Sequence, residues 1–454
     1  MTDRLWSLPA ALGIGGRPEL VAFVGGGGKT SLMFALAAAL PGRVVMTTTT
    51  RIFAAQTKHA TAVVHEDDLA PLGDALAAHG RCLVVGRVEG DKALGVDPGL
   101  PGRLLARGDV DYVLVEADGS RMRPIKAPAD HEPVIPPDTT LLVPMAGMDA
   151  LEGTIEEVGH RPERIREIRN YELGIRNKAW PSIVEGRLTA AGLARVLAHP
   201  QGGLKGVPAG AQVIPFLNKA DTAERLERAQ EAAALLLREP RVSRVAIGAL
   251  HAEKPVREVR RRVAAVVLAA GESRRMGTNK LLLPWGEMSV LERTLRNVAA
   301  SGVAETVVVT GHEQEFTEPL AVRYGRVSFN RDYTKGMLSS VQTAVHAIGP
   351  AAEAMLVMLG DQPLVGPDII DALLAAYAAG PHGLVAPTYG GRRGNPVIID
   401  RCYFAELLAL PPEAAPRALL QRHPDDLLLV EVESDAILHD LDQPEDYERL
   451  RPHP

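Results

Sequence analysis

One segment constrains the fold of this chain more than any other: Val263–Lys280, with the sequence VAAVVLAAGESRRMGTNK. Its apolar, partly β-branched start, Val263–Leu268, is typical of a buried strand in a parallel sheet. The small residues that follow let backbone N–H groups touch a phosphate, and basic side chains add positive charge there. We therefore expect a nucleoside triphosphate to be bound by Leu268, Ala269, Ala270, Gly271, Arg275 and Lys280.

The thirteen residues from Leu268 to Lys280 are similar to L-A-A-G-x-S-x-R-M-G-x-x-K. This is the signature of molybdenum cofactor cytidylyltransferases and of the wider MobA-like nucleotidyltransferases. The resemblance implies a Rossmann-like nucleotide-diphospho-sugar transferase fold. It also implies transfer of CMP from CTP to the phosphate of molybdenum-bound molybdopterin, with release of pyrophosphate. Relatives with LAAG tend to use CTP and those with LAGG tend to use GTP, so Ala270 indicates CTP.

A metal site is expected next to this loop. The strand expected at Met355–Leu359 ends in Gly-Asp-Gln-Pro, which places Asp361 at the edge where parallel sheets bind ligands. Its carboxylate suits Mg²⁺, although a β-turn after a strand would also explain these four residues. The segment resembles the metal motif of the family, and HDLDQPED near the chain end resembles its D-I-D-T-P-E-D. Asp442 is therefore expected to bind the metal with Asp361, and Asp440 is the alternative.

Gly391–Pro396 is similar to the G-x-R-G-N-P segment of the same family. The resemblance implies that Arg393, Gly394 and Asn395 lie on the side of the pterin substrate, whereas the alternative is a hairpin with a solvated arginine. The implied mechanism is attack of the terminal phosphate of molybdopterin on the α-phosphate of CTP. Such transfer depends on charge neutralisation and positioning, so the expected catalytic residues are Arg275, Lys280 and Asp361.

A second glycine-rich loop follows the buried strand expected at Leu20–Val24. Strand, glycine loop, Gly-Lys-Thr and helix form the layout of a P-loop, in which Lys29 reaches the β and γ oxygens and Thr30 binds Mg²⁺. Phe23 stands where the P-loop pattern has its first glycine, so we expect a differently shaped loop that suits a binding switch as well as a hydrolase. The expected phosphate-binding residues are Gly25, Gly26, Gly27, Gly28, Lys29, Thr30 and Ser31.

Two further features indicate nucleotide binding in this half. Val113–Asp118 reads as an apolar strand that ends in carboxylates, which makes Glu116 the expected partner of Thr30 at a Mg²⁺ ion. The sequence Asn-Lys-Ala-Asp at 218–221 has the N-K-x-D pattern with which GTPases bind guanine. We therefore expect GTP, with ATP as the alternative, and recognition of the base by Asn218, Lys219 and Asp221.

The N-terminal half also resembles the selenium-dependent hydroxylase accessory proteins, a YqeC-like family, through residues 24–31, 47–51, 116–136 and 160–163. This resemblance implies a role in the maturation of molybdenum hydroxylases, with such an enzyme as the client. We assign no metal to His131, Glu132 or His160, because a lone histidine is more often structural. Arg121 and Lys126 could contact a phosphate or be solvated loop charges.

Strand-like and helical patterns alternate in both halves, so the fold class is α/β with mostly parallel sheets. We expect a P-loop NTPase-like domain over residues 1–255 and the transferase domain over residues 256–454, with the boundary in the charged segment Ala252–Arg262. Strands are expected at Leu20–Val24, Val44–Thr47, Cys82–Val85, Val113–Glu116, Leu141–Pro144, Val213–Leu217, Val263–Leu268, Thr306–Thr310, Met355–Leu359, Gly383–Pro387, Pro396–Asp400 and Leu427–Val432. Helices are expected at Ser31–Leu40, Asp68–Ala78, Thr222–Leu237, Val290–Ala300, Ser339–Ala347 and Pro367–Ala379.

Composition narrows the classes of function. A net charge of -6 argues against nucleic acid as a partner, and no apolar run is long enough to span a membrane. The first residues lack a basic region followed by an apolar stretch, so the cytoplasm is the expected location. Cys82 and Cys402 do not form a disulfide framework and are expected to be small buried residues.

Two other functions stay open at this point. A nucleotidyltransferase that acts on a sugar or polyol phosphate would use the same nucleotide site. A nucleotide-dependent cofactor chaperone would have no transferase turnover, although Lys280 and Asp361, which turnover requires, are both present.

Overall fold

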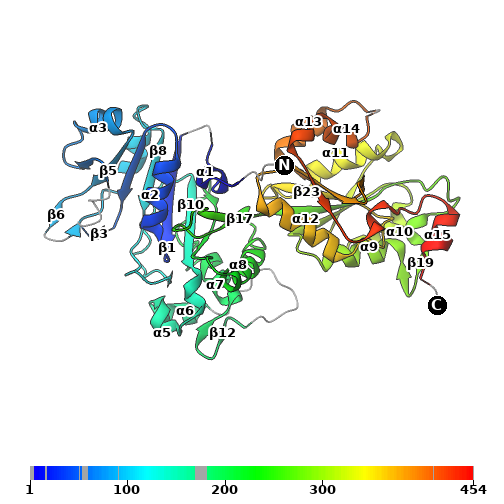
Figure 1. Cartoon of the computed structure of the whole chain (residues 1–454), viewed down its shortest axis with the longest axis horizontal. Coiled ribbons are helices and arrows are strands. Elements are labelled where there is room, and N and C mark those ends of the chain that lie inside the picture. Colours follow the sequence, from blue (N-terminus) through cyan, green and yellow to red (C-terminus); the bar gives the residue numbers. More distant parts are fainter. Residues whose placement is uncertain are drawn as a thin grey trace. The chain divides into compact units, whose positions relative to one another are not determined.

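The chain forms two compact units, Trp6–Arg260 and Arg261–Pro454 (Figure 1). The computed structural model describes residues 5–15, 18–50, 52–53, 60–89, 92–168, 181–412 and 414–452. Each unit is an α/β domain with a largely parallel sheet, which confirms the expected fold class. No helix in these ranges is both long and apolar enough to cross a membrane.

A ten-stranded sheet forms the centre of the first unit, in the order β17-β16-β15-β10-β1-β8-β2-β5-β4, with β14 beside β10. The glycine-loop strand β1 lies between β10 and β8 and runs parallel to both. The strands are β1 (Glu19–Gly25), β2 (Val44–Thr48), β4 (Val63–His65), β5 (Arg81–Val85), β8 (Tyr112–Glu116), β10 (Leu141–Gly147), β14 (Gln212–Val213), β15 (Phe216–Asn218), β16 (Arg244–Gly248) and β17 (Val256–Arg261).

Helices cover both faces of this sheet, which explains why β1 is buried along its whole length. Phe23 packs with α1 (Leu8–Ala11) and α2 (Lys29–Ala39) on one face. Ala22 packs with α7 (Ala190–Ala198) and α8 (Ala223–Leu236) on the other. The remaining helices are α3 (Leu72–His79), α4 (Leu100–Leu105), α5 (Ile155–Val158) and α6 (Pro162–Ile168), and the small strands β9 (Ile125–Lys126) and β11 (Gly159–His160) pair with each other.

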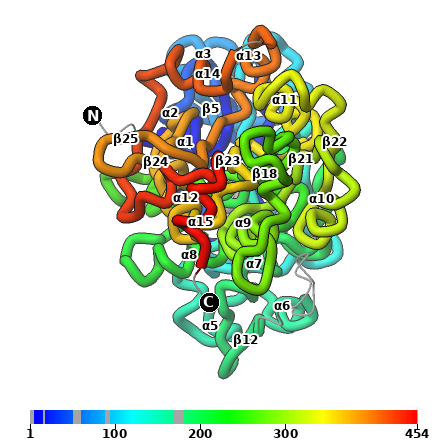
Figure 2. The backbone as a smooth tube through the Cα atoms, turned by 90° about the vertical axis from the view of Figure 1, so that its right-hand side faces the viewer, coloured from blue at the N-terminus to red at the C-terminus, as the bar shows by residue number. Residues whose placement is uncertain are grey.

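The second unit has an eight-stranded sheet in the order β22-β21-β18-β23-β26-β24-β25, with β27 beside β24. The strands β23, β18, β21 and β22 are parallel and follow one another across the sheet (Figure 2), whereas β26 is antiparallel to both of its neighbours. The strands are β18 (Val263–Ala269), β21 (Glu305–Thr310), β22 (Arg326–Phe329), β23 (Ala354–Leu359), β24 (Leu384–Tyr389), β25 (Arg392–Arg393), β26 (Val397–Asp400) and β27 (Leu427–Glu431).

Alternate residues of β18 face two cores. Val267 packs with α9 (Val290–Ala299) and α12 (Pro367–Ala379), and Val266 packs with α11 (Met337–Ala347), α13 (Phe404–Ala409) and α14 (Arg417–Arg422). The shorter helices α10 (Gln314–Ala321) and α15 (Pro444–Leu450) complete the unit. The strand is therefore buried on both faces, as its continuous apolar sequence predicts.

Three local expectations are wrong. The strand expected at Val213–Leu217 is divided into β14 and β15 at Pro215, which has no N–H to donate to a neighbouring strand. Helix α3 begins at Leu72 rather than Asp68, because Pro71 fits only at the start of a helix. Cys82 is buried as expected, but Cys402 is exposed.

Arg261, the first residue of the second unit, is a buried arginine. Its side chain is only 5% exposed and forms an ion pair of 2.8 Å with Asp400. It donates a hydrogen bond of 2.7 Å to the carbonyl of Tyr377, and its guanidinium lies 3.3 Å from the centre of the Tyr377 ring. The Tyr377 hydroxyl in turn donates to Asp400 at 2.5 Å, so one cation joins strand β26 to helix α12.

We predict that Arg261→Met destabilises the second unit by about 3 kcal/mol, because it leaves the Asp400 carboxylate without its cation. Calorimetric unfolding of the full chain measures this loss. Arg326→Met is the matched control, since the Arg326–Glu305 pair is exposed and should contribute at most about 1 kcal/mol. Equal losses in the two variants would contradict the prediction.

Candidate functional site

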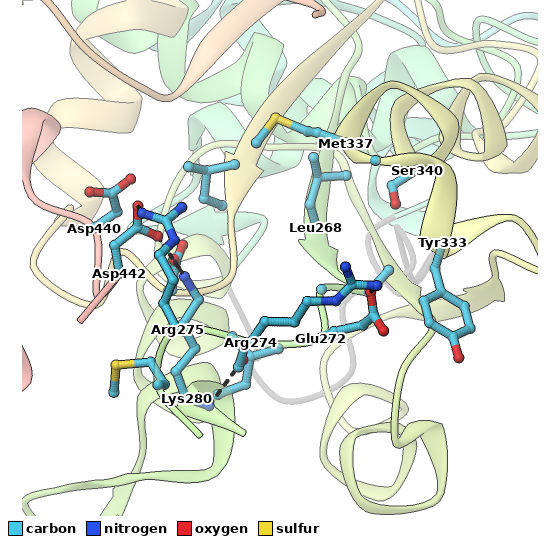
Figure 3. Close-up of a pocket in the computed structure, with 18 of the residues that line it drawn as sticks. Leu268, Glu272, Arg274, Arg275, Lys280, Tyr333, Met337, Ser340, Asp440 and Asp442 are labelled. Carbon is cyan, nitrogen blue, oxygen red and sulfur yellow. Dashed lines mark hydrogen bonds and ion pairs between the residues drawn. The ribbon is translucent and has the colours of Figure 1, made fainter. Parts of the chain in front are cut away.

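A cavity of about 510 Å³ lies where β18 and β23 end. The two strands are paired in parallel register, with Leu268 opposite Leu359, so the loop after β18 and Asp361 after β23 leave the sheet together. Figure 3 shows this cavity with Arg275 and Lys280 beside Asp440 and Asp442. The residues expected to bind the triphosphate, apart from the buried Ala269, therefore share one cavity with the expected metal ligands.

Lys280 is the central cation of the cavity. Its ammonium group forms ion pairs with Asp361 and with Asp442, the latter at 3.1 Å, and its side chain is 17% exposed. Its backbone N–H donates to the Ser273 hydroxyl at 3.2 Å, which fixes the lysine to the glycine loop. Burial alone would lower the pKa of Lys280, but the two carboxylates raise it above its usual value. The lysine is therefore a permanent cation at neutral pH.

The acidic residues of the cavity fit a divalent cation. Asp442 also pairs with Arg275 at 2.9 Å, and burial together with Asp442 and Asp361 raises the pKa of Asp440. Such crowding of carboxylates is relieved by a bound cation. No three His, Cys, Asp or Glu residues in the described part of the chain form a complete metal cage. Mg²⁺ needs no such cage, because it is usually held by one or two carboxylates, water and substrate phosphates.

The opposite wall of the cavity comes from the start of α11 and the turn before it, including Tyr333, Met337 and Ser340 (Figure 3). Asn330 donates hydrogen bonds of 2.8 Å to Ser339 and 3.0 Å to Ser340, so it holds both serine hydroxyls in place. Tyr333 was not identified from the sequence as a residue of this cavity. Nothing in the sequence around Tyr333 connects it to the distant glycine loop.

The expected acceptor residues lie outside the lining of this cavity. Gly394 donates its N–H to Pro387 at 3.0 Å, and a side chain at Gly394 would overlap the carbonyl of Ile437. Asn395 donates its N–H to that same carbonyl at 3.2 Å. Arg393 is exposed on β25. The backbone contacts of Gly394 and Asn395 therefore hold the segment at Ile437, which precedes Asp440 and Asp442 in the chain.

A second cavity, of about 930 Å³, lies beside the glycine loop of the first unit. The N–H groups of Gly25, Gly26 and Gly27 donate to Asp118, Met145 and Arg123 respectively. The N–H groups of Gly28–Ser31 belong to the start of α2, where no preceding turn can accept them. A bound phosphate would therefore meet the N-terminal end of this helix.

Lys29 and Thr30 meet the carboxylates at the end of β8. Lys29 is 2% exposed, forms an ion pair of 3.3 Å with Asp118, and donates to the carbonyl of Gly25 at 2.6 Å. The Thr30 hydroxyl donates to Glu116 at 2.7 Å. Burial raises the pKa of Glu116. Mg²⁺ prefers oxygen ligands, so the hydroxyl of Thr30 and the carboxylate of Glu116 fit a Mg²⁺ ion.

A chain of ion pairs continues from Lys29 through Asp118 to Lys126, Glu132 and Arg161. Lys126 is fully buried and lies 3.1 Å from Asp118 and 2.8 Å from Glu132, and Arg161 lies 2.8 Å from Glu132. Burial of Glu132 would raise the pKa of its carboxyl group, but the hydrogen bond and charge of Lys126 outweigh this effect and lower the pKa to about 2. Lys126 is therefore no solvated loop charge, although Arg121 is exposed.

The residues of the Asn-Lys-Ala-Asp segment are engaged within the protein. Asn218 donates to the carbonyl of Gly27 at 2.8 Å and accepts from the N–H of Leu250, so it fixes the glycine loop. Lys219 pairs with Asp149 at 2.6 Å. Asp221 pairs with Arg225 at 2.8 Å and does not line the cavity. Arg51, part of the resemblance in this half, lies outside the described residues.

The structure divides into two α/β domains, each with a cavity beside a glycine loop. The family model for YqeC protein matches residues 21–163, and the model for the MobA-like NTP transferase domain matches residues 265–427. Protein YqeC of Escherichia coli is 30% identical over 47% of this chain and 80% of its own length. The chain therefore belongs to the YqeC family through its N-terminal half and carries a MobA-like NTP transferase domain in its C-terminal half.

Two further relatives match the C-terminal half. Molybdenum cofactor cytidylyltransferase of Escherichia coli is 29% identical over 40% of this chain and 92% of its own length. The crystal structure of Rv0371c from Mycobacterium tuberculosis is 27% identical, covers 42% of this chain and 97% of its own, and has a TM-score of 0.39.

We predict that Gly27→Ala destabilises the first unit by about 3 kcal/mol and abolishes the nucleotide binding that is expected at its glycine loop. Gly27 has a φ of +78°, and a methyl group on it would overlap the backbone of Ala146 and Gly147. Calorimetry and nucleotide titration measure the two effects. Gly210→Ala is the control, because nothing lies within 4 Å of its added methyl group. A Gly27 variant as stable as the control would contradict the prediction.

Proposed function

We propose that the C-terminal domain, residues 256–454, transfers CMP from CTP to the phosphate of molybdenum-bound molybdopterin and releases pyrophosphate. The observation that carries the proposal is Lys280, which is held between Asp361 and Asp442 in the cavity of the glycine loop. The similarity to a molybdenum cofactor cytidylyltransferase and the presence of Ala270 support the acceptor and the nucleotide.

In this mechanism the chain binds and neutralises charge rather than forming a covalent intermediate. The backbone from Leu268 to Gly271 receives the nucleotide, and Arg275 and Lys280 exchange their carboxylate partners for phosphate oxygens. Asp361 and Asp442 would hold Mg²⁺, which supplies Lewis-acid stabilisation of the phosphate charge when bound. The acceptor phosphate is ionised at neutral pH and needs no general base. Arg393, Gly394 and Asn395 are proposed to lie toward the acceptor.

The N-terminal domain, residues 1–255, is proposed to be P-loop-like and to bind GTP or ATP at Gly25–Ser31. Thr30 and Glu116 would hold its Mg²⁺, and Asn218, Lys219 and Asp221 would read a guanine base. The buried Lys29 and the open N–H groups at the start of α2 support this site. We propose that the domain assists cofactor delivery to a client molybdenum hydroxylase in the cytoplasm.

The transferase proposal predicts that Asp361→Ala lowers CTP-dependent pyrophosphate release by at least about 100-fold, because it removes a metal ligand and a lysine partner. The assay supplies molybdopterin and Mg²⁺ with each nucleoside triphosphate in turn. Asp368→Asn, an exposed aspartate at the start of α12, is the control and should retain activity. Release that requires GTP or a sugar phosphate, or that survives Asp361→Ala, would contradict the proposal.

For the first domain, Asp221→Asn is predicted to weaken GTP binding about tenfold and to leave ATP binding unchanged. The substitution removes the carboxylate that a guanine base would engage and also the ion pair with Arg225. Glu224→Gln controls for the second effect, since Glu224 forms a similar exposed pair with Arg228 on the same helix. An unchanged preference for GTP in Asp221→Asn would refute guanine recognition by this residue.

A further inference from the structure

The cavity of the N-terminal domain is lined by basic side chains that lie outside the glycine loop. Its volume of about 930 Å³ lies near the upper end of the ~300–1,000 Å³ range of small-molecule sites. Besides Lys29 it is lined by Arg121, Arg161 and His160, none of which belongs to the glycine loop. These three side chains need a separate explanation.

His160 lies in the wall of this cavity. Strands β9 and β11 pair in parallel with His160 opposite Lys126, which fixes the position of the histidine backbone. The Nδ1 atom of His160 is buried and has no hydrogen-bond partner among the described residues. Burial, with Arg161 and Lys126 nearby, lowers the pKa of His160 to about 4, so the ring is neutral at pH 7. A buried polar atom of this kind is normally satisfied by a protein group, an ordered water or an ion.

The two arginines supply charge to the same wall. Arg161 is tied to Glu132 at 2.8 Å, whereas no hydrogen bond or ion pair joins the exposed Arg121 to another residue that the structure describes. Both arginines have a left-handed backbone conformation, with φ of +69° and +50°. That conformation is unfavourable for a side-chain-bearing residue and is found preferentially where a ligand is held.

Ion pairs connect this wall to the nucleotide loop. Arg161, Glu132, Lys126, Asp118 and Lys29 form one continuous series, with charged atoms 2.8 to 3.3 Å apart at each step. The carboxylates of this series are already shared between cations. The free positive charge at the wall therefore comes from Arg121, with Arg161 beside it.

We propose that this cavity binds a second ligand together with the nucleotide: a small molecule with a phosphate group, held by Arg121, His160 and Arg161. Guanidinium groups bind phosphate oxygens with paired hydrogen bonds, and a neutral imidazole can donate one more. The inference rests on the proposed nucleotide site at Gly25–Ser31. It makes the N-terminal domain a two-substrate site rather than a simple nucleotide switch.

Equilibrium dialysis of the full chain with radiolabelled inorganic phosphate tests the proposal, in the presence of saturating Mg²⁺ and a non-hydrolysable GTP or ATP analogue. Arg121→Ala and His160→Gln are each expected to weaken phosphate binding about tenfold, with analogue affinity changed less than twofold. Arg238→Ala, an exposed arginine away from the cavity, should bind phosphate as the wild type does. Phosphate held by the other domain is the same in all variants and cancels in the comparison.

Equal phosphate binding in wild type, Arg121→Ala and His160→Gln would overturn the proposal. Displacement of phosphate by the analogue would also overturn it, because a single shared site would then explain both ligands. Preferential binding of acetate at this wall would overturn the phosphate assignment. The nucleotide site itself is tested separately by Lys29→Ala: analogue binding that survives this substitution refutes that site, whatever the phosphate result.

Discussion

Both halves of the chain depend on one constraint: a strand that ends in a glycine loop pairs in parallel register with a strand that ends in an acid. In the second unit Leu268 lies opposite Leu359, and in the first unit Phe23 lies opposite Glu116. Parallel strands end at the same edge of a sheet, so loop and acid leave the sheet together. Each loop then brings its own lysine back to that acid.

The paired lysines make both cavities candidate sites for phosphates. Lys280 meets Asp361 and Asp442, and Lys29 meets Asp118, so each cation is fixed by carboxylates before any ligand arrives. A positioned cation stabilises phosphate charge with little reorganisation. In the second unit, Asp361 and Asp442 are also the proposed ligands of Mg²⁺, and a metal bound there would release Lys280 to the phosphates. The two domains thus share the arrangement of a lysine paired with carboxylates. They differ in one contact: Asp118 also accepts a hydrogen bond from the backbone N–H of Gly25, whereas no loop N–H donates to Asp361 among the described residues.

Most strands and helices of this structure could be predicted from the sequence. Continuous apolar runs such as Val263–Leu268 are typical of strands buried on both faces, and the loop and acid after such strands lie at the edge where parallel sheets bind ligands. Prolines caused the local errors at Pro71 and Pro215, where a missing N–H outweighs an apolar pattern. The strand expected at Pro396–Asp400 is present as β26, but its antiparallel direction was not predicted, because strand direction depends on pairing rather than on composition.

Side-chain networks were less predictable than the fold. Lys126 read equally well as a solvated charge, since only the fold brings it to Asp118 and Glu132. Tyr333 lines the cavity after β18 although it belongs to a distant part of the chain. Such contacts between remote segments depend on tertiary packing, for which one sequence carries no local signal.

The most direct test of the account is a crystal structure of the full chain with CTP and Mn²⁺, in which anomalous scattering locates the metal. The account predicts a triphosphate in contact with Lys280 and Arg275, and a metal peak at Asp361 and Asp442. A nucleotide bound outside this cavity, or a metal peak away from both aspartates, would contradict it.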